Sequence, residues 1–77
     1  MTPLADVFAK ILKEPAESFT AESSRQNSVN WTSLKHVALL VAIETEYSVK
    51  FSNPEMTTMF TMGDIRKVLT EKGVSDI

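Results

Sequence analysis

Hydrophobic residues recur at helical spacing in three parts of the chain, with polar stretches between them. The first series repeats every three to four residues, which is typical of the buried face of an amphipathic helix. It consists of Leu4, Val7, Phe8, Ile11 and Leu12. Thr2 followed by Pro3 favours a helix start and Pro15 favours a helix end, so the pattern predicts a helix over residues 3–13 with Thr2 as its N-cap.

The second series is longer and predicts a central helix that begins at Thr32 or Ser33 and ends near Tyr47 or Ser48. At about 100° per residue, one broad face of this helix is apolar and is predicted to be buried. This face carries Val37, Leu39, Leu40, Ile43 and Tyr47, with His36 near its centre. The opposite face carries Leu34, Ala38, Val41 and Thr45.

Residues 15–32, between these two helices, show little periodicity and are mostly polar. They predict a long loop, which inside a small domain is typical of a functional segment. Phe19 and Trp31 are predicted to anchor this loop, with their rings lying over the core.

The third series predicts two further helices near the C-terminus. Asn53 as N-cap and Pro54 as first residue favour a short helix over residues 54–59. Thr61 and Asp64 have the spacing of a capping box and predict the start of a closing helix, which Gly73 ends. The last three residues, 75–77, are expected to fray.

These elements predict an all-α fold: a small four-helix bundle with a long loop between helices 1 and 2 and a short helix 3. The length indicates a single domain over residues 1–77. The predicted core consists of Leu4, Val7, Phe8, Ile11, Leu12, Val37, Leu40, Ile43, Tyr47, Phe51, Ile65, Val68 and Leu69. Met56, Met59 and Met62 are predicted to fill gaps in it.

Charge and composition narrow the possible functions. The 8 Lys and Arg residues against 10 Asp and Glu give a formal net charge of -2, which argues against nucleic-acid binding, because that needs a clustered positive face. With no cysteine and one histidine, neither a disulfide framework nor a structural zinc site is expected. No apolar stretch reaches the roughly 18 residues of a membrane span, and the N-terminus lacks the basic region of a signal peptide. We therefore expect a soluble, cytoplasmic monomer.

Ser33 is the candidate functional residue, since it lies where the polar loop gives way to the central helix. A hydroxyl there is expected to be exposed, beside unpaired backbone N–H groups and the positive end of the helix dipole, which suits a phosphate group. Serine is also common at this position as a helix cap alone, and this alternative stays open. In another alternative, Ser33 and His36 are neighbours in a hydrolase site, although no orienting acid or oxyanion hole is visible.

Three segments carry a resemblance to one protein family. They are Trp31-Thr32-Ser33-Leu34, the stretch 42–51 with its acidic helix end, and Thr61-Met62-Gly63-Asp64-Ile65. In this order and spacing the chain resembles the acyl carrier proteins, whose signature is Asp-Ser-Leu followed by an apolar helix. Here the signature reads Thr-Ser-Leu.

The resemblance implies that Ser33 carries 4′-phosphopantetheine, which a phosphopantetheinyl transferase attaches from coenzyme A through a phosphodiester. The thiol of this arm holds an acyl group as a thioester and presents it to the acyl-loading and acyl-using enzymes of a fatty-acid, polyketide or related pathway. The carrier then needs no catalytic residue and no metal of its own. Two alternatives stay open: an aminoacyl or hydroxyacyl carrier, and an acyl-carrier-like interaction module without a prosthetic group.

The chain departs from the family pattern in two places. Thr32 stands where the family has an aspartate; threonine can still cap the helix, so the change is expected to affect recognition by the transferase. The predicted partner-binding face consists of Thr32, Leu34, Lys35, Ala38, Val41 and Thr45. Because this face lacks the acidic side chains of many family members, binding is expected to depend on apolar contact and only weakly on salt.

Overall fold

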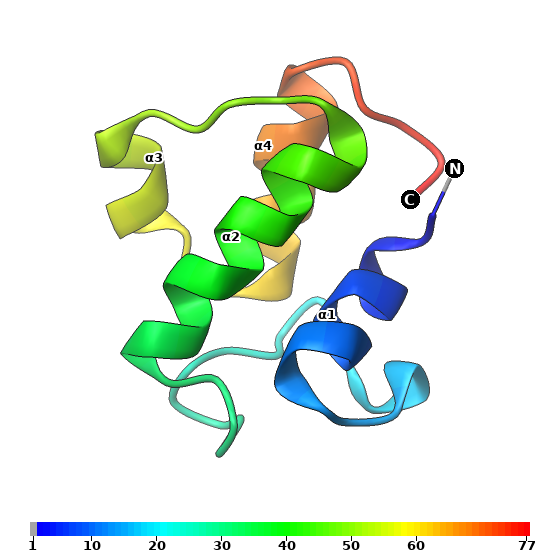
Figure 1. Cartoon of the computed structure of the whole chain (residues 1–77), viewed down its shortest axis with the longest axis vertical. Coiled ribbons are helices and arrows are strands. Elements are labelled where there is room, and N and C mark those ends of the chain that lie inside the picture. The colour runs from blue at the N-terminus through cyan, green and yellow to red at the C-terminus, as the bar shows by residue number, and fades with distance from the viewer. Residues whose placement is uncertain (1) are drawn as a thin grey trace.

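The computed structural model describes residues 2–77 and confirms the all-α prediction. The helices are α1 (Leu4–Leu12), α2 (Ser33–Tyr47), α3 (Asn53–Thr58) and α4 (Met62–Glu71), and a short 3₁₀ turn, η1, spans Ala16–Ser18. The described residues contain no β-strand. In Figure 1, α2 runs through the middle of the molecule, with α1 on one side, α3 on the other and α4 behind. Within residues 2–77, none of these helices has the length and apolar character that crossing a membrane requires.

The start of α1 differs from the sequence prediction. Pro3, not Thr2, is the N-cap residue, with an extended backbone (φ -62°, ψ 142°). The Thr2 hydroxyl donates instead to Glu46 Oε2 at 2.7 Å, a contact that depends on how α1 packs against α2. At the other end of α1, Lys13 adopts the left-handed conformation (φ 61°) that ends the helix.

Both C-terminal helices begin with a capping box, in which the N-cap side chain and the side chain three residues later satisfy each other's backbone N–H. In α4 the predicted pair, Thr61 and Asp64, forms this box. In α3 the N-cap is Ser52 rather than the predicted Asn53, because the Glu55 carboxylate accepts the Ser52 N–H at 2.8 Å. This bond is the main reason that the pKa of the Glu55 carboxyl lies below its ordinary value.

The core lies where α1, α2 and α4 meet and confirms most of the predicted positions. Its buried apolar residues are Leu4, Val7, Phe8, Leu12, Phe19, Trp31, Leu39, Leu40, Ile43, Tyr47, Phe51, Met59, Met62, Ile65, Leu69 and Val74. Ile11 and Val68, which we predicted as core residues, are partly buried against this cluster. Met59 and Met62 fill the core as predicted, and Met56 is partly buried beside them.

Val37 is the predicted core residue that the structure places elsewhere, because its side chain is 61% exposed. It lies about 100° around α2 from His36, whose side chain is buried. The buried face of α2 is therefore narrower than the run of apolar residues indicates, and Val37 belongs to the face that meets solvent.

The aromatic anchors of the long loop are buried as predicted. The rings of Phe19 and Trp31 both meet Phe8 edge-on, with centroids 5.4 and 5.1 Å from the Phe8 centroid. Edge-on aromatic pairs at this separation are favourable beyond the area that they bury. They fix the two ends of the loop against α1.

The middle of the loop is tied to the start of α4. The Met62 N–H donates to the Ser23 carbonyl and the Gly63 N–H donates to the Ala21 carbonyl, each at 2.9 Å. A Cβ atom at Gly63 would lie 3.0 Å from the Ala21 carbonyl oxygen, so a larger residue there would require one of the two backbones to move by a few tenths of an ångström. The loop is thus bound both to α1, through its aromatic rings, and to the start of α4.

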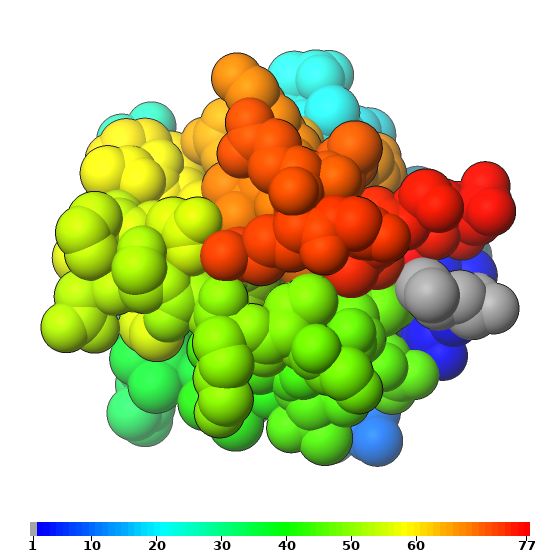
Figure 2. Space-filling view, turned by 90° about the horizontal axis from the view of Figure 1, so that it is seen from above, coloured from blue at the N-terminus to red at the C-terminus, as the bar shows by residue number. Residues whose placement is uncertain are grey.

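The C-terminal segment returns to the start of α1, and the expected fraying of residues 75–77 stays a prediction. Gly73, with φ 92°, follows α4 as predicted. Beyond it, Val74 is 5% exposed, and the Leu4 N–H donates to the Ile77 carbonyl at 3.2 Å. Figure 2 shows this segment, coloured orange to red, running from α4 towards the blue start of the chain.

Candidate functional site

Ser33 is the first residue of α2, and its side chain is exposed. The residue that caps the helix is Thr32, whose hydroxyl accepts the Lys35 N–H at 3.2 Å. The alternative in which Ser33 serves as the cap is therefore wrong. Within residues 2–77 the Ser33 hydroxyl forms no hydrogen bond, which leaves it free to react or to be modified.

The backbone around Ser33 suits an anion. The N–H groups of Ser33 and Leu34 belong to the first turn of α2, where no carbonyl of the same helix can accept them. α2 is 15 residues long, so its dipole adds partial positive charge at this end. A phosphate ester attached to Ser33 Oγ would lie next to these N–H groups.

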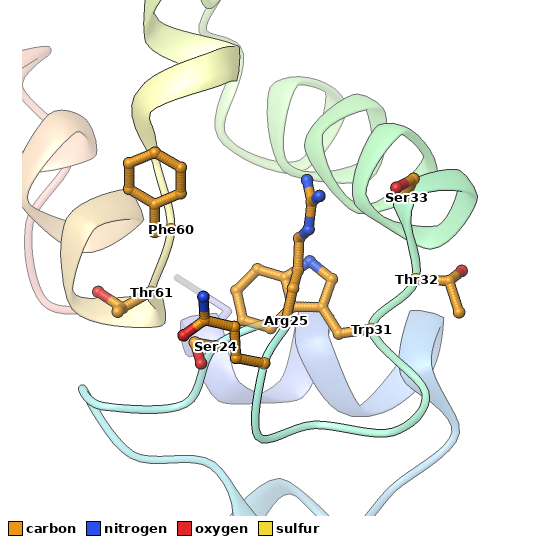
Figure 3. A pocket seen from close by; sticks show the side chains of 8 residues that line it. Ser24, Arg25, Trp31, Thr32, Ser33, Phe60 and Thr61 are labelled. Atoms are coloured by element: carbon orange, nitrogen blue, oxygen red, sulfur yellow. The ribbon is translucent and has the colours of Figure 1, made fainter.

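Two hollows in the surface meet at Ser33. The larger, of about 730 Å³, lies between the long loop and the turn before α4; the smaller, of about 410 Å³, runs between α2 and α3. Ser33, Arg25 and Phe60 line both of them. Figure 3 shows the larger hollow, with the Trp31 indole in the middle of the labelled side chains and Ser33 at one side.

His36, three residues after Ser33, holds the start of α2 in place. Its ring is 6% exposed and stacks on Trp31, with centroids 6.0 Å apart. Trp31 Nε1 donates to His36 Nδ1 at 3.1 Å, and because an indole nitrogen only donates, His36 Nδ1 is unprotonated. His36 Nε2 then carries the proton and donates to the Met56 carbonyl at 3.1 Å. The hydrolase alternative requires one ring nitrogen to accept a proton from Ser33. Both nitrogens are engaged in these hydrogen bonds, so neither is available for that role.

The predicted partner-binding residues lie together on the outer side of α2. Leu34 is 81% exposed and Val41 55% exposed, and Val37 adds a third apolar side chain between them. Thr32, Ala38 and Thr45 are exposed as well, whereas Lys35 is half-buried. Exposed aliphatic side chains in such a continuous stripe are typical of a contact surface.

Arg25 and Phe60 are site residues that the sequence analysis missed. Arg25 comes from a polar stretch of the long loop, and Phe60, at 62% exposed, comes from the link between α3 and α4. Each lies near Ser33 only because the tertiary fold brings the loop and the α3–α4 link to the start of α2. The one signal in the sequence is that Phe60 is an aromatic residue outside the helical series of apolar positions.

The comparisons with known proteins do not add a relative. No family model and no curated protein matches this chain. The resemblance to acyl carrier proteins therefore stays a prediction from the sequence.

Proposed function

We propose that this chain is a carrier protein with a four-helix bundle of acyl-carrier type, which holds its cargo on 4′-phosphopantetheine attached to Ser33. The observation that carries the proposal is the state of Ser33: an exposed hydroxyl at the first turn of a long helix, free of any capping role. The Thr-Ser-Leu signature and its spacing to the two later segments support the same assignment.

The residues around Ser33 fit the prosthetic group. Ser33 Oγ supplies the ester oxygen, and the free N–H groups of Ser33 and Leu34 suit the phosphate. The two hollows give the arm room on either side of its attachment point. When bound, the arm supplies a thiol that holds an acyl group as a thioester.

The outer side of α2 is the surface that we assign to partner enzymes. Leu34, Val37 and Val41 present an apolar stripe that begins next to Ser33 and extends about 12 Å along α2, where an enzyme that reaches the arm can dock. The contact then depends little on charge. We expect the affinity for the transferase to fall only slightly between low and physiological salt, and a steep fall would contradict this assignment.

Intact-mass measurement tests the proposal. The purified chain is incubated with coenzyme A and a promiscuous phosphopantetheinyl transferase, and Ser33→Ala is treated in parallel. In the expected reaction Ser33 Oγ displaces adenosine 3′,5′-bisphosphate from coenzyme A and loses its proton, so the chain gains one phosphopantetheinyl group. Ser33→Ala gains nothing and keeps its helical circular dichroism, because Thr32 provides the cap.

Two outcomes of this experiment would contradict the proposal. If the parent gains no mass and the chain isolated from its own host is also unmodified, the carrier proposal is wrong, and the interaction module without a prosthetic group takes its place. If Ser33→Ala gains the same mass as the parent, the attachment site is wrong.

A further inference from the structure

Arg25 lies at the edge shared by the two hollows beside Ser33. In Figure 3 its guanidinium group stands between Ser33 and the Phe60 ring. None of the groups in residues 2–77 forms an ion pair or a hydrogen bond with that guanidinium. We propose that Arg25 binds the phosphodiester of the group attached to Ser33 and so orients the base of the arm, a role that rests on the function proposed above.

The charge around Ser33 favours this pairing. Arg25 is the one charged side chain among the described residues that line the larger hollow. The smaller hollow adds Glu44, which lies eleven residues along α2 from Ser33, a distance of about 16 Å along the helix axis. The Glu44 carboxylate also accepts the Phe51 N–H at 2.8 Å, which holds it at the far end. Among the described side chains that line the two hollows, Arg25 is therefore the one cation available to an anion on Ser33, and the one carboxylate lies at the far end of α2.

The backbone of Arg25 is fixed by the turn that contains it. The Ser24 N–H donates to Asn27 Oδ1 at 2.9 Å, and the Asn27 N–H donates to the Ser24 carbonyl at 3.3 Å. Ser24 also pairs with Thr61 in an isolated β-bridge, which ties the turn to the start of α4. Because hydrogen bonds already hold the backbone of this turn, binding does not require the loop around Arg25 to be ordered as well.

The chemistry of the two groups is complementary. A phosphodiester carries one negative charge at neutral pH, and a guanidinium group can donate two parallel N–H bonds to its oxygens. Lysine supplies the charge without the paired donors. Arg25 therefore gives the arm a preferred direction, along the hollows and across the Phe60 ring, that a free tether lacks.

Nuclear magnetic resonance of the loaded chain tests the inference, with a mass spectrum first establishing whether Ser33 is loaded. At low salt, loading is expected to shift the Nε–Hε resonance of Arg25 and to reduce its motion. About 1 M salt is expected to reverse most of that shift, because exposed charges are then screened. The ³¹P resonance of the phosphodiester is expected to move in Arg25→Gln, to move less in Arg25→Lys, and to stay in place in Lys67→Gln. Lys67→Gln is the matched control, because it removes one exposed positive charge from a residue outside both hollows.

The outcomes separate the inference from the function on which it rests. A loaded chain whose Arg25 resonance equals that of the unloaded chain overturns the role of Arg25 and leaves the carrier function standing. The same holds if Arg25→Gln only slows loading while the ³¹P resonance is unchanged, since Arg25 then serves the transferase. A chain that gains no mass on Ser33 and is also unmodified when isolated from its own host overturns both proposals.

Discussion

The two ends of α2 are held in different ways. At the C-terminal end, the Tyr47 hydroxyl donates to the Thr2 carbonyl at 2.7 Å, and the Glu44 carboxylate accepts the Phe51 N–H at 2.8 Å. Side chains of the last turns thus bind the segments before α1 and after α2 directly. At the N-terminal end, the first residue, Ser33, forms no such contact.

The N-terminal end is anchored one turn inside the helix instead. His36 connects Trp31 of the loop to the Met56 carbonyl of α3; Trp31 and His36 are buried and Met56 is partly buried. This helix end is stabilised by contacts beneath its first turn, which leave the Ser33 hydroxyl exposed. The comparison shows how a small domain can present a free hydroxyl without losing the order of the helix that carries it.

Removal of the Trp31 side chain is expected to break the N-terminal anchor most severely. Trp31 is 1% exposed, packs edge-on against Phe8 and donates to His36. Trp31→Ala is expected to lower the free energy of unfolding by about 3–5 kcal/mol, a large part of the 5–15 kcal/mol or so that folded domains have. Urea unfolding followed by circular dichroism measures the loss. Phe60→Ala, which removes an exposed ring from the same site, is expected to change stability by no more than about 0.5 kcal/mol, and equal losses in the two variants would contradict the anchor.

Loss of the His36 ring nitrogens is expected to have an intermediate effect. His36→Leu leaves the buried Trp31 N–H and the Met56 carbonyl without their partner, which is expected to cost about 1–3 kcal/mol. The Trp31 indole N–H is expected to exchange faster with water in this variant. Val37→Ala, one residue further along α2 and exposed, is the control and should stay within about 0.5 kcal/mol of the parent. A His36→Leu chain as stable as the parent would show that packing alone holds this end.

The hydroxyl of Tyr47 tests the other end with a smaller expected effect. Tyr47→Phe removes one partly buried hydrogen bond and is expected to cost about 0.5–1.5 kcal/mol near neutral pH in the same urea experiment. If the variant unfolds at the parent's urea concentration, the bond to Thr2 does not fix the C-terminal end of α2.

The pH dependence of that effect follows from the phenol. Burial, and to a smaller extent the carboxylates of Glu46 and Asp6, raise the pKa of Tyr47. The contribution of the neutral phenol is therefore complete below the ordinary phenol pKa of about 10 and is lost as pH rises through the higher folded value. The stability difference between parent and Tyr47→Phe should shrink over that alkaline range. Tyr47 is the only tyrosine, so absorbance titration of the phenolate reports this group alone.

Local patterns predicted the helices well because each depends on residues close in sequence. The capping box of Thr61 and Asp64 and the stop at Gly73 are examples. The errors arise where two local signals compete or where a distant segment decides. Ser52 forms a reciprocal pair with Glu55 and so displaces Asn53 as the cap of α3.

The candidate site likewise contains one position that local sequence predicts and others that depend on distant segments. The exposed position of Ser33 at the start of α2 could be predicted, because it depends on where the apolar series begins. The positions of Arg25 and Phe60 beside the same hollows could not, since they depend on the loop folding back onto α4. The prediction of Val37 as a core residue is wrong because an apolar residue beside a buried face looks the same in sequence whether it is buried or faces solvent.

A substitution at Thr32 tests the N-terminal end of α2 with the smallest expected effect on stability. It is expected to change the rate at which Ser33 is loaded and to leave the free energy of unfolding almost unchanged. Thr32 caps α2 through its hydroxyl, and an aspartate carboxylate can accept the same Lys35 N–H. Thr32→Asp is therefore expected to keep the unfolding free energy within about 0.5 kcal/mol, while a new carboxylate lies next to Ser33. We expect the transferase to load this variant about five times faster than the parent, the rate equivalent of about 1 kcal/mol.

The control is Thr32→Asn, which caps equally well and adds no charge. Initial loading rates of the three chains, read by intact mass, separate the explanations. If Thr32→Asn is loaded as fast as Thr32→Asp, the gain comes from the shape of the cap rather than from its charge. If neither variant is loaded faster than the parent, Thr32 is no obstacle to modification, and recognition depends on the apolar residues of α2 that follow Ser33.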